Sequence, residues 1–453
     1  MAKFNHPGIY VEELATFTPL QSIANTATFI GYTEIHQDLG GKNLRNIPTD
    51  ISSVMDFENF FGKAQPEENI EIIDLSEGGM TNISVRFRGM QSLHNLYYAI
   101  RMFFAQGGTS CKIVSVGTFK NIGEPLSVSE LIAGLDALKS EKSNLLIAIP
   151  ENQNFPEPDF YLLQKKILDF CKTHHSFAIL DLPKTSEANY SSIIANYREK
   201  LISPSLSFGA VFFPDLITIL NYSYCESSLQ IKTADRTFSL LSIKERDPLL
   251  YKIYFDTLKQ FFISLPPSSA VTGTIIKYDS DRGIWKSPSN IAVQGINALK
   301  INLTKFQQEA LYIDTSGKSI NCMRKFTGKG ILIWGARTLA GNDATYRYIT
   351  VRRLVNMIEN TILQSIKALV FSNNSSQTWT QVNSLISDYL WSLWKMGALL
   401  GSKPEQAFFV KCGLNETMTT RDIELGNLII EIGIAPLKPA EFIILRITQN
   451  ISD

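Results

Sequence analysis

Residues 145–213 contain three short apolar runs, LLIAI at 145–149, FAILDL at 177–182 and AVFF at 210–213, and an amphipathic segment precedes each run. The amphipathic segments repeat apolar residues at helical spacing and lie at 128–139, 159–174 and 190–200. Continuous apolar strands that alternate with amphipathic helices are typical of a parallel sheet with helices on both faces. The sequence therefore predicts an α/β domain in this part of the chain.

The segments before this stretch continue the same pattern. Residues 91–104 predict a helix that ends at Gly107-Gly108, and strands are predicted at 27–32 and 112–116. The polar stretch from 34 to 50 contains Gly and Asn residues and is expected to form an exposed loop.

A domain boundary is expected at the two prolines of LPPSS, residues 265–269. Directly after it, residues 271–278 predict a strand and residues 279–283 a turn. Two long helices are predicted at 346–370 and 377–396. Further strands are predicted at 1–14, 330–334, 407–411, 428–433 and 441–449. The chain is thus expected to begin and end on strands.

The composition is that of a globular protein without an overall charge. The 453 residues include 43 basic and 43 acidic side chains, so nothing in the net charge favours nucleic acid or an anionic membrane as a partner. The five cysteines are far apart and never in CxxC spacing, which argues against a disulfide framework or a zinc cluster. The N-terminus lacks an apolar secretory core and no run of about 18 apolar residues occurs, so we expect synthesis in the cytosol and no membrane insertion.

No phosphate-binding or dinucleotide-binding motif is complete in this sequence. GKS at 317–319 ends like a phosphate loop, but Tyr312 stands where that loop needs a glycine. The glycines of GKGILIWG, residues 328–335, have the wrong spacing for a dinucleotide fingerprint and are expected to serve close strand packing. We therefore expect no cofactor.

The remaining candidates for chemistry also favour structural roles. The pair His174-His175 has no metal-ligand spacing and lies at the end of a predicted helix, where a cation complements the helix dipole. Asp279 and Asp281 are expected to bond to the backbone of a turn rather than to form an acid/base pair. No catalytic residue and no metal ligand is assigned, and we expect that the protein is not an enzyme.

The distribution of charge is uneven along the chain. Residues 1–90 contain 6 basic and 12 acidic side chains, whereas residues 318–367 contain 9 basic and only 2 acidic ones. This excess is explained either by a solvated helix face or by a basic surface that opposes an acidic partner.

Long motifs connect this chain to a known family. They are PGIYVEE at 7–13, PPSSA at 266–270, DRGIWKSPSN at 281–290, GKGILIWGARTL at 328–339, YITVRRL at 348–354, AFFVKC at 407–412 and APLKPAEF at 435–442. In these motifs the chain resembles the sheath proteins of contractile tails, which contractile-tailed phages, R-type bacteriocins and phage-like injection systems share. The likeness is strong over 1–31 and 266–453 and only architectural between them, and Lys329 is a small departure from the family pattern.

The resemblance implies a mixed α/β and α+β fold. Both termini build a discontinuous inner sheath domain, an outer α/β domain is inserted in it, and terminal β-strand arms extend from it. The expected divisions are an N-terminal arm with the first strand, a variable outer domain, an inner sheath domain and a C-terminal linker strand, at 1–30, 31–265, 266–440 and 441–453.

The resemblance also implies a mechanical function. Sheath subunits stack as hexameric rings around an inner tube in a metastable extended state, and then contract to drive the tube through a target envelope. The implied partners are further copies of the chain, the inner tube protein, and baseplate and tail terminator proteins. Because no phosphate loop occurs, we expect contraction without nucleotide or metal. Assembly is expected in a bacterial cytoplasm; the sequence leaves open whether the particle is a phage tail, a released particle or a membrane-anchored one, and whether paralogous sheath subunits co-assemble.

Two sets of site residues follow from the resemblance. The strand arms that join neighbouring subunits are expected at Ile9, Tyr10, Val11, Glu12, Phe442, Ile443, Ile444, Leu445, Arg446 and Ile447. A basic face toward the inner tube is expected at Lys325, Lys329, Arg347, Arg352 and Arg353. The apolar stripe of the helix at 346–370 predicts that Arg347 and Arg353 project away from the core and that Arg352 lies on its flank. The alternative for these arginines is pairing with acidic residues of adjacent sheath subunits.

Two other classes of protein remain as alternatives. A static scaffold, such as a tail tube or shell protein, would share the terminal strands but lack the large outer domain. An α/β enzyme would need polar residues at the carboxyl ends of its parallel strands, whereas Pro150, Pro183 and Pro214 follow those strands here.

Overall fold

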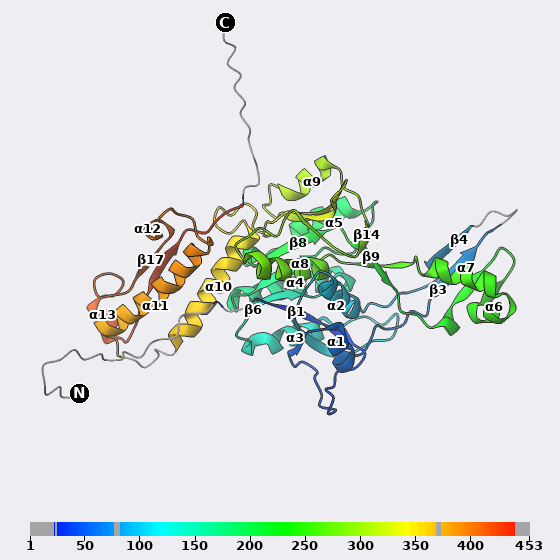
Figure 1. Ribbon diagram of the computed structural model, residues 1–453, viewed down its shortest axis with the longest axis horizontal. Coiled ribbons are helices and arrows are strands. Elements are labelled where there is room, and N and C mark those ends of the chain that lie inside the picture. Colours follow the sequence, from blue (N-terminus) through cyan, green and yellow to red (C-terminus); the bar gives the residue numbers. More distant parts are fainter. Residues whose placement is uncertain (1–21, 23–24, 77–81, 368–372, 440–453) are drawn as a thin grey trace, which may run out of the picture. The chain divides into compact units, whose positions relative to one another are not determined.

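The computed structural model describes residues 22, 25–76, 82–367 and 373–439 (Figure 1). The chain forms two compact units. The larger one comprises Ala24–Met357 with Lys438–Asp453, and the smaller one Met1–Ile23 with Ile358–Leu437. The strands predicted at 1–14 and 441–449 lie outside the described residues.

The larger unit is built on a nine-stranded sheet, in which the strands from β15 to β5 run parallel and the two ends are antiparallel. Its spatial order is β13 (Ile291–Ala292), β16 (Gly330–Trp334), β15 (Ile320–Phe326), β8 (Gly209–Phe213), β7 (Phe177–Asp181), β6 (Asn144–Ala148), β1 (Asn25–Thr33), β5 (Cys111–Thr118) and β2 (Thr49–Ile51). The parallel α/β sheet predicted from the apolar runs is confirmed.

Helices cover both faces of this sheet, so successive residues of one strand enter different cores. Phe29 of β1 packs into the core beneath α2 (Leu96–Ala105), whereas Ile30 packs into the core beneath the helices of the opposite face. Those helices are α3 (Val128–Asp136), α4 (Glu157–Thr173) and α5 (Tyr190–Lys200). Burial on both faces explains why the strands read as continuous apolar runs.

The segment predicted as a strand at 271–278 and a turn at 279–283 is instead the helix α8 (Ser268–Arg282), and that prediction is wrong. Two prolines precede its first turn, and Gly283 ends it with a φ of +89°. The residues Ser268 to Ile276 are all buried, because α8 lies between the sheet and α2. A helix that is buried all round has no amphipathic stripe, so periodicity could not identify it.

Gly273 allows α8 to cross α2 at close range. A Cβ atom at this position would lie 2.5 Å from the carbonyl oxygen of Phe103 and 2.9 Å from Cβ of Gln106. We expect Gly273→Ala to lower the free energy of unfolding by about 1–3 kcal/mol, because the backbone of α2 must shift to accept the methyl group. Urea unfolding measures this loss. Ser280→Ala, at an exposed position of the same helix, is the control and should stay within about 0.5 kcal/mol; equal effects of the two changes would contradict the close-packing role.

Two smaller sheets and further helices complete the larger unit. A four-stranded sheet packs against α7. The two share a separate core around Ile72 of the sheet and Tyr254 of α7. Its strands and helices are β11 (Thr237–Ser239), β10 (Gln230–Lys232), β3 (Ile70–Asp74), β4 (Ile83–Phe87), α6 (Leu240–Arg246) and α7 (Pro248–Leu258). The other elements are the three-stranded sheet β12 (Phe262–Leu265), β9 (Leu216–Asn221) and β14 (Ile296–Leu299), with α1 (Val54–Phe61) and α9 (Lys305–Tyr312).

The boundary expected near residue 266 does not coincide with a division of the structure. β15 pairs with β8, so a strand from beyond residue 266 belongs to the same sheet as the strands before it. The division falls instead inside α10 (Ile349–Ile366), which continues from the larger unit into the smaller one. The inner and outer domains of an assembled sheath stay a prediction.

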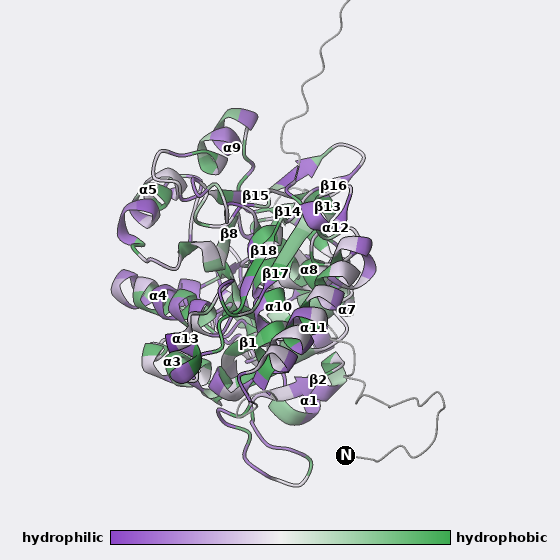
Figure 2. Cartoon of the chain, turned by 90° about the vertical axis from the view of Figure 1, so that its left-hand side faces the viewer, coloured by the Kyte–Doolittle hydropathy of each residue, from purple (hydrophilic) through white to green (hydrophobic). Residues whose placement is uncertain are grey.

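The smaller unit combines a long helix with a two-stranded antiparallel sheet. Its elements are α11 (Ser376–Lys395), α12 (Pro404–Ala407), β17 (Phe408–Lys411), α13 (Thr420–Glu424) and β18 (Glu431–Ile434). The Nδ2 atom of Asn383 on α11 donates to the carbonyl of Val410 on β17, at 3.3 Å. Figure 2 shows β17 and β18 mostly in the green of hydrophobic residues.

Candidate functional site

The sheet of β17 and β18 has an open outer edge on β18, whereas α11 lies against β17 and bonds to its Val410 carbonyl. Val410 is paired with Ile432, and at the end of the ladder the backbone N–H of Ala435 donates to the carbonyl of Ala407 at 2.8 Å. In an antiparallel ladder, the backbone N–H and C=O groups of successive residues alternate between bonding to the partner strand and pointing away from it. Ala435 bonds to β17 and Ile432 lies three positions before it, so the backbone groups of Ile432 face the outer edge of β18. Among the described residues, no third strand joins this sheet.

Exposed apolar side chains are concentrated in the same unit. Of the 22 exposed large hydrophobic residues that the described chain contains, eight lie between 358 and 437. They are Leu363, Trp391, Met396, Leu400, Phe409, Leu414, Leu425 and Ile429. Exposed apolar side chains and an open strand edge in one unit are features of surfaces that pair with another chain. We take the outer edge of β18 and these side chains as the candidate assembly surface.

The five basic residues predicted to form one face have different surroundings. Lys325 and Lys329 are exposed on the hairpin of β15 and β16. Arg347 is half-buried, and its Nε atom donates to the carbonyl of Gly341 at 2.7 Å. Arg352 and Arg353 are each only 4% exposed. The prediction that Arg353 projects away from the core, with Arg352 on the flank, is therefore wrong.

Arg353 forms a buried ion pair with Asp279, which lies near the end of α8. Its Nη1 atom donates to Oδ1 at 3.2 Å and its Nη2 atom donates to Oδ2, so the pair is bidentate. Only 3% of the Arg353 side chain and 10% of the Asp279 side chain are exposed. Burial raises the pKa of Asp279, and the charge of Arg353 opposes this rise. Asp279 is thus not the turn residue expected from the sequence, and it joins α8 to α10.

Arg352 is satisfied by a different set of groups in the same unit. Its Nε atom donates to Oδ1 of Asn356 at 2.7 Å, and its guanidinium lies 4.2 Å from the ring centre of Tyr346 and 4.5 Å from that of Phe208. Asn356 in turn donates to the carbonyl of Ser176 at 2.8 Å. The first half of α10 is covered by other elements, so its polar residues make internal contacts.

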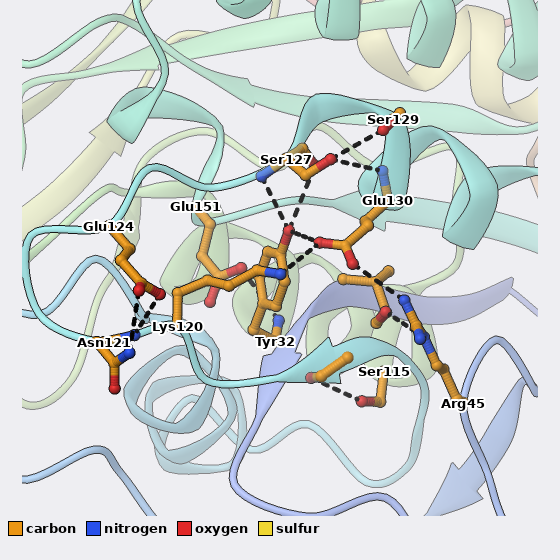
Figure 3. Close-up of polar contacts among 12 residues, drawn as sticks. Tyr32, Arg45, Ser115, Lys120, Asn121, Glu124, Ser127, Ser129, Glu130 and Glu151 are labelled. Carbon is orange, nitrogen blue, oxygen red and sulfur yellow. Dashed lines mark hydrogen bonds and ion pairs between the residues drawn. The ribbon is translucent and has the colours of Figure 1, made fainter.

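A polar cluster at the carboxyl ends of β1 and β5 occupies the place where an α/β enzyme would bind its substrate. Figure 3 shows that its members contact one another. The Tyr32 hydroxyl donates to Oε2 of Glu130 at 2.5 Å, and Glu130 also pairs with Arg45 at 3.0 Å and Lys120 at 3.2 Å. Although partial burial opposes it, the hydrogen bond from Tyr32 and the two cations lower the pKa of Glu130. The sequence did not predict this cluster, in which each charge has a partner within the protein.

His94 and Glu151 lie beside this cluster and are fully enclosed. Nε2 of His94 accepts the backbone N–H of Lys120 at 2.9 Å, which leaves the proton on Nδ1, 3.6 Å from Oε1 of Glu151. Oε2 of Glu151 accepts the backbone N–H of Tyr32 at 3.1 Å. The two side chains are 2% and 0% exposed, and their hydrogen bonds hold the backbone at Lys120 and at Tyr32 of β1.

The incomplete motifs of the sequence also make internal contacts. The Lys318 ammonium donates to the carbonyl of Arg198, and the Ser319 hydroxyl donates to that of Tyr312 at 2.8 Å. The His174 ring stacks on Phe170, one helical turn earlier in α4. Over the described parts of the chain, no group of three or more His, Cys, Asp or Glu side chains is arranged to hold a metal ion. No helix in these parts is long and apolar enough to cross a membrane.

Comparisons with known proteins agree with this picture. The model of the phage tail sheath C-terminal domain matches residues 341–450. The tail sheath protein of Vibrio phage KVP40 is 25% identical over 207 residues, which are 45% of this chain and 29% of that protein. The chain therefore spans less than a third of that relative. The sheath of an extracellular contractile injection system, the PVC complex in its contracted state, is 25% identical with a TM-score of 0.66, and the match covers 100% of this chain and 99% of that one.

The chain is similar to contractile tail sheath proteins, over residues 341–450 in sequence and along its whole length in structure. A second solved sheath, the contracted helical sheath of the anti-feeding prophage, is 25% identical with a TM-score of 0.65 over 98% of this chain and 99% of that one. These matches are to structural sheath proteins, and none of them is to an enzyme. The likeness to the solved sheaths extends through the α/β region, where the sequence motifs themselves gave only an architectural resemblance.

Proposed function

We propose that this protein is the structural subunit of a contractile sheath, in which hexameric rings stack around an inner tube and contract to drive the tube through a target envelope. The observation that carries the proposal is the unpaired edge of β18 in a family of helical sheaths. The partners would be further copies of this chain, the tube protein, and baseplate and terminator proteins. The particle would assemble in a bacterial cytoplasm as a phage tail or a tail-like particle.

The link between subunits would be strand addition. The segments 9–12 and 442–447, which lie outside the described residues, are the arms we propose for it. An arm that pairs with the outer edge of β18 gains main-chain hydrogen bonds worth about 0.5–1.5 kcal/mol each. Because these bonds involve only the terminal arms, the domains could swing during contraction while the links persist.

The contact with the inner tube would use the exposed part of the basic set. Lys325 and Lys329 on the β15–β16 hairpin are the charges most available to an acidic partner. Exposed ion pairs contribute only about 0–1 kcal/mol each, which suits a contact that forms in the extended state and is lost on contraction. Arg352 and Arg353 would act indirectly, by holding α10 in place.

The substitution Ile432→Pro tests strand addition directly. Proline removes the N–H that faces the outer edge of β18 but removes no bond to β17, so the isolated subunit should stay folded. We expect this variant to form no sheath-like tubes, as seen by negative-stain electron microscopy of the purified protein. Ile432→Ala keeps the N–H and is the matched control, which should form tubes as the unsubstituted protein does.

Circular dichroism and thermal unfolding of both variants would show that the subunit itself is intact. Normal tubes from Ile432→Pro would exclude the edge of β18 as the acceptor of an arm.

A further inference from the structure

A groove of about 530 Å³ lies on the larger unit. It is lined by α9, the end of β16 and the loop around Asn290. Pro439, the last residue that the structure describes, also lines it. Neither the ion pair of Asp279 nor the polar cluster at the ends of β1 and β5 contributes to its lining. The groove is therefore a separate feature that the proposed strand addition does not use.

The lining of the groove combines apolar, polar and charged residues. Tyr312, Ile313, Trp334 and Ala336 supply apolar surface, and Ile313 is 56% exposed. The charged residues of the lining are Lys305, Glu309 and Arg324. Such a lining fits an extended peptide with apolar side chains and both signs of charge.

The C-terminal segment of this chain begins at the groove. The Lys438 ammonium donates to the carbonyl of Ala344 at 2.9 Å, and the next residue, Pro439, lines the groove. The sequence continues as AEFIILRI at 440–447. Phe442 follows Pro439 by three residues and can lie no more than about 10 Å from it.

The sequence of this segment also fits the groove in charge. If 441–447 is extended, each of its faces carries one charged residue and is otherwise apolar, so in an unassembled subunit it needs apolar surface to cover it. Glu441 is opposite in charge to Lys305 and Arg324 of the lining, and Arg446 is opposite in charge to Glu309. A tethered segment also has a far higher effective concentration at this groove than any free chain.

We propose that, before assembly, residues 440–447 dock in the groove of their own chain, with Phe442 against Ile313 and Trp334. In this position the C-terminal arm stays bound to its own subunit until it leaves the groove and pairs with the strand edge of a neighbouring subunit. The docking itself is independent of the proposed sheath function, whereas the transfer to a neighbour rests on it.

Cysteine cross-linking in the full chain tests the docking. The variant carries Ile313→Cys and Phe442→Cys, with Cys225→Ser to remove the exposed native thiol. A mixture of ¹⁴N- and ¹⁵N-labelled protein is oxidised mildly below the concentration of assembly, and the linked peptides are analysed by mass spectrometry. The control pairs Phe442→Cys with Leu249→Cys, at a position on α7 that is 79% exposed and does not line the groove.

We expect the groove pair to link at least tenfold more than the control pair, with both peptides from one isotope. Yields equal to the control would overturn the docking. Linked peptides of mixed isotope would overturn docking in cis, because the occupant would then be a second copy. Neither result touches strand addition, which the Ile432 variants decide separately.

Limited proteolysis gives a second measurement that needs no cysteines. Ile313→Asp should make trypsin cleave after Arg446 at least tenfold faster than in the unsubstituted protein, because the segment is then displaced. Phe306→Asp is the control, since Phe306 lies on α9, is 79% exposed and does not line the groove. Equal cleavage rates in all three proteins would contradict the proposal.

Discussion

Asp279→Ala is expected to lower the free energy of unfolding by about 3–5 kcal/mol, because it leaves the buried guanidinium of Arg353 without its carboxylate. Both oxygens of Asp279 accept from this guanidinium, and only 3% of the Arg353 side chain is exposed. The lost partner is on α8 and the stranded charge is on α10, so the change should also loosen the start of α10. Urea unfolding, with hydrogen exchange of the α10 amides, measures both effects.

Two further variants show whether the loss of stability comes from the buried, unpaired charge of Arg353 or only from the loss of one ion pair. Asp281→Ala is the matched control, since Asp281 lies half a turn away and forms an exposed pair with Lys277 at 3.0 Å. It should cost no more than about 1 kcal/mol. The double change Asp279→Leu with Arg353→Met should recover most of the stability, because apolar residues of similar size often replace a buried pair without loss. If Asp279→Ala costs no more than Asp281→Ala, the pair does not carry a buried charge.

The central sheet could be predicted from the sequence because its physical signal is local. A strand buried on both faces must be apolar at every position, and LLIAI at 145–149 or GILIW at 330–334 meets this condition within five residues. The predicted helix at 190–200 and the strand at 330–334 have the same bounds as α5 and β16. Their periodicity and punctuation required no knowledge of the rest of the chain.

The sequence analysis did not predict helix α8, because the evidence for a helix lies in the residues at its two ends and not in the spacing of its apolar residues. The run of small and β-branched residues from Ser268 to Ile276 favours a strand by propensity. Tertiary burial on all sides overrides that preference. The two prolines before the helix and Gly283 after it were the usable evidence, since this order of proline and glycine marks the start and the end of a helix.

The candidate site was predicted least well, because its contacts join distant parts of the chain. Arg353 meets Asp279 across 74 positions of sequence, and no local pattern specifies such a partner. The strands of β17 and β18 were predicted near their observed bounds, yet their open edge depends on which strands pair in space. The groove combines α9, β16 and Pro439 in the same way.

We also expect the free energy of unfolding to depend strongly on pH because of Asp181. It lies at the carboxyl end of β7, and its Oδ1 atom accepts the backbone N–H of Ser268 at 2.9 Å. Burial raises the pKa of Asp181 to about 8, although the hydrogen bonds from Ser268 oppose this rise. In the unfolded chain an aspartate has a pKa of about 3.9. Between about pH 4 and pH 8 the folded state therefore binds one proton that the unfolded state does not.

This difference in bound protons decides the sign of the effect. Where the folded state binds more protons, the free energy of unfolding falls as the pH rises, and the Asp181 contribution is fully lost above its folded pKa. At about 1.4 kcal/mol for each pH unit, the loss between pH 5 and pH 9 is on the order of 4 kcal/mol. Asp181→Asn keeps an oxygen that can accept from Ser268 but cannot ionise, so we expect it to become more stable than the unsubstituted protein as the pH rises.

Urea unfolding of both proteins at pH 5, 7 and 9 measures this change. Buried carboxyl groups such as Glu67 and Asp215 titrate in both proteins, so most of their effect cancels in the difference between them. The difference should grow by several kcal/mol from pH 5 to pH 9 in favour of Asp181→Asn. A difference that stays constant with pH would mean that Asp181 does not hold a proton in the folded protein. In that case a charged Asp181 would sit at the N-terminus of α8, and the neutral asparagine would weaken the link between β7 and α8 equally at every pH.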